Sequence, residues 1–103
     1  SIITAVTKAA AAEYNGSIEN GVVTDDMAYS EAQAFVQIAR RDAETISTTA
    51  TDENIAKKAD RIADILTGEP QPFARTETGF VAFDTAILLA MAARVELIAS
   101  QVR

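Results

Sequence analysis

Apolar residues recur every three or four positions along most of this chain, which is the spacing of helices that bury one face. Glycines and prolines gather between these stretches and divide the chain into four helix-length blocks. The first block covers about Ile2–Tyr14 and extends at most to Glu19. Asn20–Gly21 ends it, and Val22–Val23 follows as a short extended connector.

The second predicted helix is the longest, with about six turns, and Thr24 or Asp25 caps its first amide groups. It ends at Ser47–Thr49, because hydroxyl and β-branched side chains there weaken a helix. Its predicted buried stripe consists of Ala28, Ala32, Phe35, Ala39, Ala43 and Ile46.

The third predicted helix begins after a cap at Thr51 or Asp52 and ends at Gly68. Glu53 precedes Lys57 by four positions, which is the favourable order for an ion pair on a helix. The residues predicted to be buried on this helix are Ile55, Ala59, Ile62, Ala63 and Leu66.

Both prolines lie in Glu69–Thr78, which is predicted to be the one substantial loop. From about Gly79 onward the chain is apolar on nearly every side of a fourth helix. Either the other helices surround this helix, or part of its surface is an interface. Together the four blocks predict an all-α fold, an antiparallel up-down four-helix bundle, formed by residues 1–103 as a single domain.

Composition excludes many kinds of site. The chain has no cysteine and no histidine, so disulfides, thiolate nucleophiles, Ser-His-Asp triads and the usual zinc sites are ruled out. No general base stands at a recognisable spacing from a serine or threonine, and we expect no enzyme activity. The formal net charge of -6 disfavours nucleic acid and favours a cation or a basic partner. The longest uncharged apolar run, Thr85–Ala93, is about half of the ~20 residues that cross a bilayer.

Phenol and carboxylate groups stand near both ends of the first connection, as Glu13 beside Tyr14 and Tyr29 near Glu31. Oxygen ligands of this kind bind hard cations, so these four residues are the candidate metal ligands. The alternative is that each tyrosine packs its ring in the bundle and hydrogen-bonds its hydroxyl at the rim. Asp25–Asp26 is similarly open to a capping or a metal-binding interpretation, and we favour capping.

Asp84 is unusual because it lies in the apolar fourth block, where an unpaired charge is costly. It is either an interior carboxylate at a site or a first-turn charge near the positive end of the helix dipole. A third interpretation pairs it with Arg75 or Arg94. The upstream Thr78–Gly79 favours the first-turn position.

The stretch Glu13–Val23 (EYNGSIENGVV), followed by Tyr29–Phe35 (YSEAQAF), resembles an extracytoplasmic helical region of bacterial high-affinity iron permease family proteins. The shared pattern is an acidic-Tyr pair, a Gly-x-Val turn, and a tyrosine with glutamate two residues later. The resemblance implies a periplasmic helical domain that serves iron uptake by a membrane permease. The family's Arg-Glu-x-x-Glu iron motif has no copy here, because Arg41–Glu44 differs in residue and spacing.

No iron-ligating role therefore carries over from the family. What the resemblance implies is a set of residues with a structural role in the turn between the first two helices. This set consists of Tyr14, Gly21, Val23, Tyr29, Glu31 and Phe35. We expect a non-enzymatic, extracytoplasmic accessory domain of a bacterial iron or cation uptake system. Its expected partner is a membrane permease or another protein, with at most a weak site for iron or another hard cation. The alternatives are a protein-interaction or dimerisation module, in which the exposed part of the fourth helix packs on a partner or in a homodimer, and a ligand-binding bundle with an apolar pocket near Phe80, Phe83 and Asp84.

Overall fold

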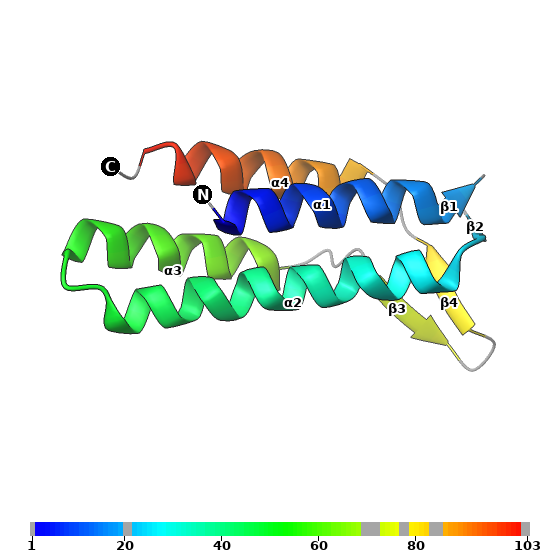
Figure 1. Ribbon diagram of the computed structural model, residues 1–103, viewed down its shortest axis with the longest axis horizontal. Coiled ribbons are helices and arrows are strands. Elements are labelled where there is room, and N and C mark those ends of the chain that lie inside the picture. The colour runs from blue at the N-terminus through cyan, green and yellow to red at the C-terminus, as the bar shows by residue number, and fades with distance from the viewer. Residues whose placement is uncertain (1, 20–21, 69–72, 77–78, 83–85, 102–103) are drawn as a thin grey trace.

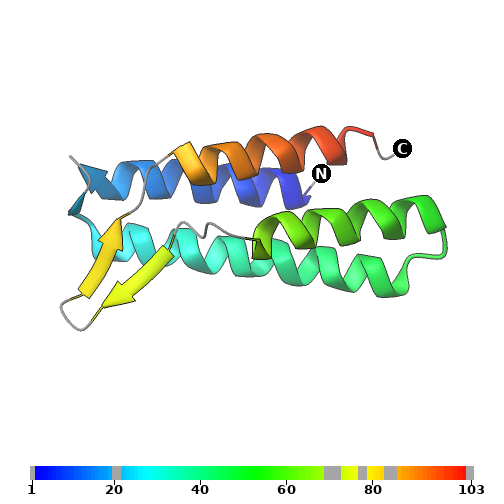
Figure 2. The same cartoon turned by 180° about the vertical axis from the view of Figure 1, so that it is seen from behind.

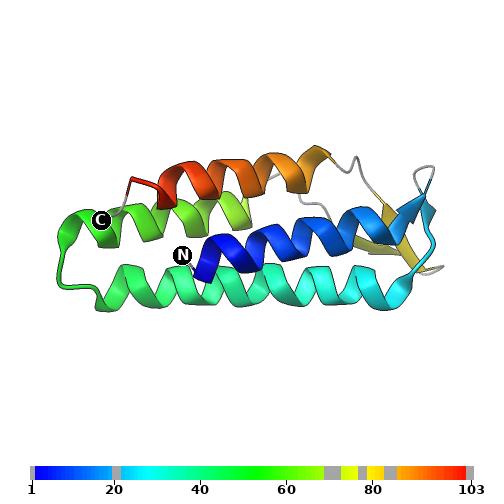
Figure 3. The same cartoon turned by 45° about the horizontal axis from the view of Figure 1, so that its top comes forward.

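The computed structural model describes residues 2–19, 22–68, 73–76, 79–82 and 86–101. Within these residues the chain forms four helices, α1 (Ile2–Ser17), α2 (Asp26–Thr49), α3 (Glu53–Thr67) and α4 (Ala86–Ala99). Successive helices run in opposite directions along an elongated body (Figure 1). Helix α2 packs between α1 and α3, and α4 contacts both α1 and α3, which closes the bundle (Figure 3). The predicted all-α, antiparallel up-down four-helix bundle is therefore confirmed.

Aspartate side chains define the starts of the second and third helices. The Asp25 carboxylate accepts a hydrogen bond from the Ala28 amide at 3.0 Å. The Asp52 carboxylate accepts from the amides of Asn54 and Ile55. Because the first amides of a helix have no partner within the helix, each cap satisfies donors that would otherwise be left unpaired. Both positions were among the predicted caps, and Gly68 caps the end of α3 as expected.

Helix α2 ends at Thr49, which lies within the predicted end at Ser47–Thr49, and these three residues are themselves helical. The three hydroxyl groups donate to backbone carbonyls one turn earlier, at Glu44 and Thr45. Such side-chain hydrogen bonds destabilise a helix when they replace the backbone hydrogen bonds of the helix itself. Here they are made within the helix, and the chain leaves it only at Ala50.

Two antiparallel hairpins lie at one end of the bundle (Figure 2). Strand β1 (Ile18–Glu19) pairs with β2 (Val22–Val23) between α1 and α2. Strand β3 (Phe73–Thr76) pairs with β4 (Gly79–Ala82) between α3 and α4. Strands β2 and β4 contact each other, so the two connections meet. We use the name hairpin end for this end of the molecule, formed by residues 13–31 and 73–82 where described.

The fourth helix begins later than predicted, because Gly79–Ala82 is a strand and α4 starts at Ala86. Phe80 and Val81 are aromatic and β-branched residues, which favour strands. A run that is apolar on every side has no helical period, so its pattern cannot separate a helix from a buried strand. The predicted loop Glu69–Thr78 likewise contains β3.

Alanines supply a substantial part of the described core beside larger aliphatic and aromatic residues, and their small side chains let the helices approach closely. In α2 the buried residues are Tyr29, Ala32, Val36, Ala39 and Ala43, so three of the six predicted positions are buried. Phe35 and Ile46 are partly buried against the same core. The buried stripe of α2 is therefore rotated about the helix axis from the predicted stripe, toward the face that carries Tyr29. The buried residues of α3 are Ala59, Ile62, Ala63, Ile65 and Leu66, which include four of the five predicted.

Several predictions concern residues that lie outside the described ranges. These are the role of Asp84 and a pocket near Phe83, whereas the first helix is described to its end at Ser17, within the predicted limit of Glu19 and ahead of the predicted stop at Asn20–Gly21. The side chains of Arg75 and Phe80 are likewise not described. Among the helices that are described, none is long and apolar enough to cross a membrane.

Candidate functional site

Three aromatic rings meet at the hairpin end. Tyr14 comes from the last turns of α1, Tyr29 from the first turn of α2, and Phe73 from the first position of β3. The two tyrosine ring centroids are 5.6 Å apart, and Phe73 stands edge-on to both, at 5.2 Å from Tyr14 and 5.3 Å from Tyr29. Edge-to-face pairs of this kind are each worth about 0.5–1.5 kcal/mol beyond burial. The rings therefore hold three chain segments together.

The first connection fixes the two tyrosines next to each other. The Ser17 carbonyl accepts hydrogen bonds from the amides of Thr24, at 2.7 Å, and Asp25, at 3.3 Å. The Ser17 hydroxyl in turn donates to the Tyr14 carbonyl at 2.7 Å. The bonds to the Ser17 carbonyl tie the last turn of α1 to the residues that lead into α2, and Tyr14 and Tyr29 are both completely buried.

The four candidate metal ligands are placed in two different environments. Tyr14 and Tyr29 are packed inside, whereas Glu13 is half-buried and Glu31 is exposed. Ring packing, which was the alternative for the tyrosines, is what the structure shows for both. Among the described residues, no three Asp or Glu side chains converge as they would around a metal ion. The site of Glu13, Tyr14, Tyr29 and Glu31 stays a prediction.

Helix ends and helix surfaces account for several other charged residues that the sequence singled out. Asp25 is a helix cap, in line with the interpretation favoured for Asp25–Asp26. The predicted pair of Glu53 with Lys57 forms at 3.4 Å, and Arg40 pairs with Glu44 at 3.8 Å. Such pairs on a helix are each worth only about 0.2–0.5 kcal/mol.

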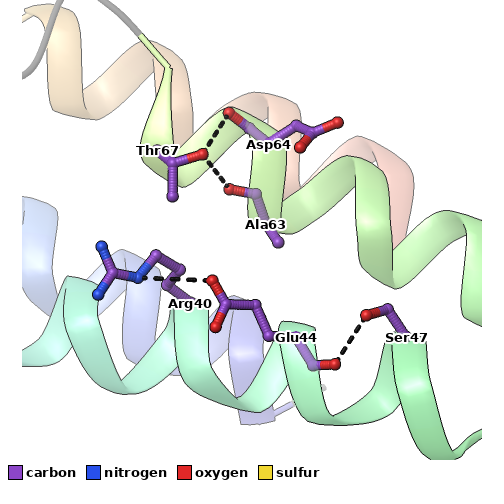
Figure 4. Close-up of polar contacts among 6 residues, drawn as sticks. All are labelled: Arg40, Glu44, Ser47, Ala63, Asp64 and Thr67. Carbon is purple, nitrogen blue, oxygen red and sulfur yellow. Dashed lines mark hydrogen bonds and ion pairs between the residues drawn. The ribbon is translucent and has the colours of Figure 1, made fainter.

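Figure 4 shows polar contacts on neighbouring parts of α2 and α3. The Ser47 hydroxyl donates to the Glu44 carbonyl at 2.7 Å, and the Thr67 hydroxyl donates to the carbonyls of Ala63 and Asp64. Each contact drawn there joins two residues of the same helix, either α2 or α3. These contacts are made within each helix, and none of those drawn forms a polar site between the two helices.

Two features were not anticipated from the sequence. Phe73 was treated as part of a proline-containing loop, although an aromatic residue shortly after Pro72 is a signal for a strand. A groove between α3 and α4, with Arg61 and Arg94 among its lining residues, was also missed. No local sequence pattern marks that groove, because its walls come from two helices that are distant in the sequence.

The chain was compared with known families, curated proteins and solved structures. No curated protein and no solved structure matches it significantly. The model of one family, the iron permease-associated 4-helix bundle domain, matches residues 1–69. The matched part includes α1, α2 and α3, and with them the turn and both tyrosines that carried the resemblance to the iron permeases. Because the match covers more than half of the sequence, the chain belongs to the iron permease-associated 4-helix bundle domain family.

Proposed function

We propose that this chain is a non-enzymatic, extracytoplasmic accessory domain of a bacterial iron-uptake system and that it contacts a membrane iron permease. The observation that carries the proposal is the family match over α1, α2 and α3. The extracytoplasmic location is supported by the resemblance of Glu13–Val23 to a region on that side of bacterial permeases. A non-enzymatic role is supported by the lack of histidine and cysteine.

The hairpin end offers the chemistry for a weak cation contact. The carboxylates described there come from α1, β1, the α2 cap and α2, and they are Glu13, Glu19, Asp25, Asp26 and Glu31. Iron in either common oxidation state accepts oxygen ligands. In this proposal Glu13 and Glu31 meet the cation first, because their side chains reach solvent. Tyr14 and Tyr29 hold the two helices that carry them, and their phenol oxygens become ligands only when this end of the bundle opens.

Thermal unfolding of the purified domain tests the cation contact. The protein is melted alone and with ferric citrate, with ferrous iron under anaerobic conditions, with calcium and with copper. A cation that occupies a native site at 100 times its dissociation constant adds about 2.7 kcal/mol, which raises Tm by several degrees in a domain of this size. We expect this shift with iron and a smaller one with calcium.

Matched variants assign the shift to residues. The double variant Glu13→Gln/Glu31→Gln loses the iron-dependent shift, whereas Glu44→Gln/Glu53→Gln, with the same change of charge at the far end of the bundle, keeps it. Tyr14→Phe and Tyr29→Phe retain the rings and remove only the hydroxyls, so they report whether phenol oxygens bind iron. Equal losses in both double variants, or no iron-dependent shift in the native protein, would contradict the cation contact.

A second candidate function, a protein-interaction or dimerisation module, is favoured by the surface of α4. Leu89 and Leu97 on this helix are 47% and 62% exposed. An exposed leucine is common on its own, but two on one largely apolar helix suit a protein contact. Solution mass and the dependence of Tm on protein concentration test for a dimer, because a dimer melts at a higher temperature when it is more concentrated.

A further inference from the structure

A groove of about 720 Å³ runs between α3 and α4. Its floor is apolar and includes the buried residues Ile65, Met91 and Ile98. Along α4 its wall extends from Ala86 to Ile98, a length of about 18 Å at the rise of a helix. The two helices lie side by side in antiparallel directions (Figures 1 and 2), so the groove follows the long direction of the bundle.

The groove is partly open to solvent. Small exposed residues, Ala86 and Ala90, line one wall, and the exposed side chain of Leu97 adds apolar surface to it. Sites for small molecules enclose 70–90% of their ligand. A partly open, elongated and apolar channel instead fits a helix that lays one apolar face into it.

The rim of the groove is basic although the chain as a whole is acidic. Arg61 on α3 and Arg94 on α4 stand on opposite walls, with Asp64 as the acidic lining residue. Within the described residues neither arginine forms an ion pair, whereas Lys8, Arg40 and Lys57 each do. These two arginines, which form no ion pair within the described residues and lie beside an apolar floor, attract carboxylates, and arginine is enriched in protein interfaces.

We propose that this groove docks an amphipathic helix of a partner protein, with apolar residues facing the floor and acidic residues meeting Arg61 and Arg94. A second copy of this chain fits less well. A two-fold contact through the groove would bring the same rim, with two arginines and one aspartate, against itself. The like charges of the arginines oppose such a dimer, while an acidic helix is complementary to them.

This inference rests on the proposed function for the identity of the partner, which is the permease or a protein associated with it. It does not depend on the cation contact at the hairpin end. The groove therefore has a test of its own, made on the whole chain without iron.

The probe is a synthetic helical peptide of about 14 residues, long enough to follow α4. Leucines lie on one face with glutamates along its edges, and a matched peptide carries lysines in place of the glutamates. Binding of each is measured by titration calorimetry and by NMR shifts of the protein. We expect the glutamate peptide to bind about tenfold more tightly than the lysine peptide, with shifts confined to α3 and α4.

Variants in matched pairs locate the binding. Arg94→Glu or Arg61→Glu reverses the preference between the peptides, while Arg41→Glu on α2, with the same change of charge, does not. Leu97→Gln in the groove weakens binding about tenfold, whereas Leu89→Gln, on the same helix outside the groove, leaves it unchanged. All five residues are exposed, so the variants are expected to fold, and circular dichroism checks this.

Three results would overturn the proposal. These are no binding of the glutamate peptide, equal effects of the groove variants and their controls, and a dimer in solution that Leu97→Gln converts to a monomer. The last result would assign the groove to a second copy. Peptide binding as expected together with no iron effect and no contact with a permease would retain the docking groove and reject the proposed function.

Discussion

Helices α2 and α4 differ in how their apolar residues relate to the core. Helix α2 lies between two neighbours, and its buried residues form one stripe, with mostly polar residues and the exposed Met27 and Ile38 on its other faces. Helix α4 is apolar nearly all round, yet Leu88 is completely buried while the adjacent Leu89 is 47% exposed. Helix α4 is therefore far more apolar than its burial in this chain requires.

The difference teaches that the apolar content of a helix does not measure how much of it lies in the core. A four-helix bundle buries one stripe of each helix, whatever the other faces carry. Apolar residues outside the stripe are then available to a second surface. Within the described residues, these include Leu89 and Leu97 on α4, which the family match does not reach, and Met27 and Ile38 on α2.

The largest effect is expected from removing an aromatic ring on the α2 side. Tyr29→Ala should lower the free energy of unfolding by about 3–5 kcal/mol, because it leaves a cavity between Tyr14 and Phe73. Denaturant unfolding measures the loss. The control is Met27→Ala on the same helix, where the side chain is 74% exposed and a change within about 0.5 kcal/mol is expected.

The next largest effect separates the two faces of α4. Leu88→Ala should cost about 3 kcal/mol, since it opens a cavity in the core, and Leu89→Ala should cost less than about 0.5 kcal/mol. Both variants are compared in the same unfolding experiment. Similar losses from the two changes would mean that α4 is not oriented as described.

A smaller effect is expected at the start of α2. Asp25→Ala removes the acceptor for the Ala28 amide and should cost about 1 kcal/mol. Asp26→Ala removes a neighbouring charge without removing the cap, so its cost is limited to the helix-dipole term of about 0.3–1 kcal/mol. Thermal unfolding at low salt resolves the pair. A larger loss from Asp26 than from Asp25 would contradict the capping role.

The smallest expected effect is a gain in stability, at Arg40. The Arg40 Nε atom is buried and, within the described residues, has no hydrogen-bond partner, since Glu44 lies 3.8 Å away. Arg40→Met keeps the packing of the stem and removes this donor, so we expect a gain of up to about 1 kcal/mol. Arg41→Met, at an exposed position, should change nothing measurable. The midpoints of urea unfolding, measured for the two variants and the native protein, test this expected gain in stability.

The parts of the fold that were predicted from sequence are those with local signals. The caps at Asp25 and Asp52 follow from the chemistry of helix starts, and the α3 stripe follows from a clean period. The strand at Gly79–Ala82 was missed because pairing with Phe73–Thr76, and not a local period, selects its structure. The third ring of the aromatic cluster and the groove were missed for a similar reason. Both depend on contacts between segments that are distant in the sequence, and the walls of the groove come from α3 and α4.

Binding of the chain to a bacterial iron permease reconstituted in nanodiscs tests the central claim most directly. Interferometry of the native protein and two variants gives the affinity. The account predicts saturable binding that Arg94→Glu weakens about tenfold and Arg41→Glu leaves unchanged. Binding no stronger than to empty nanodiscs would contradict the claim that this domain serves the permease, and equal binding by both variants would place the contact outside the groove.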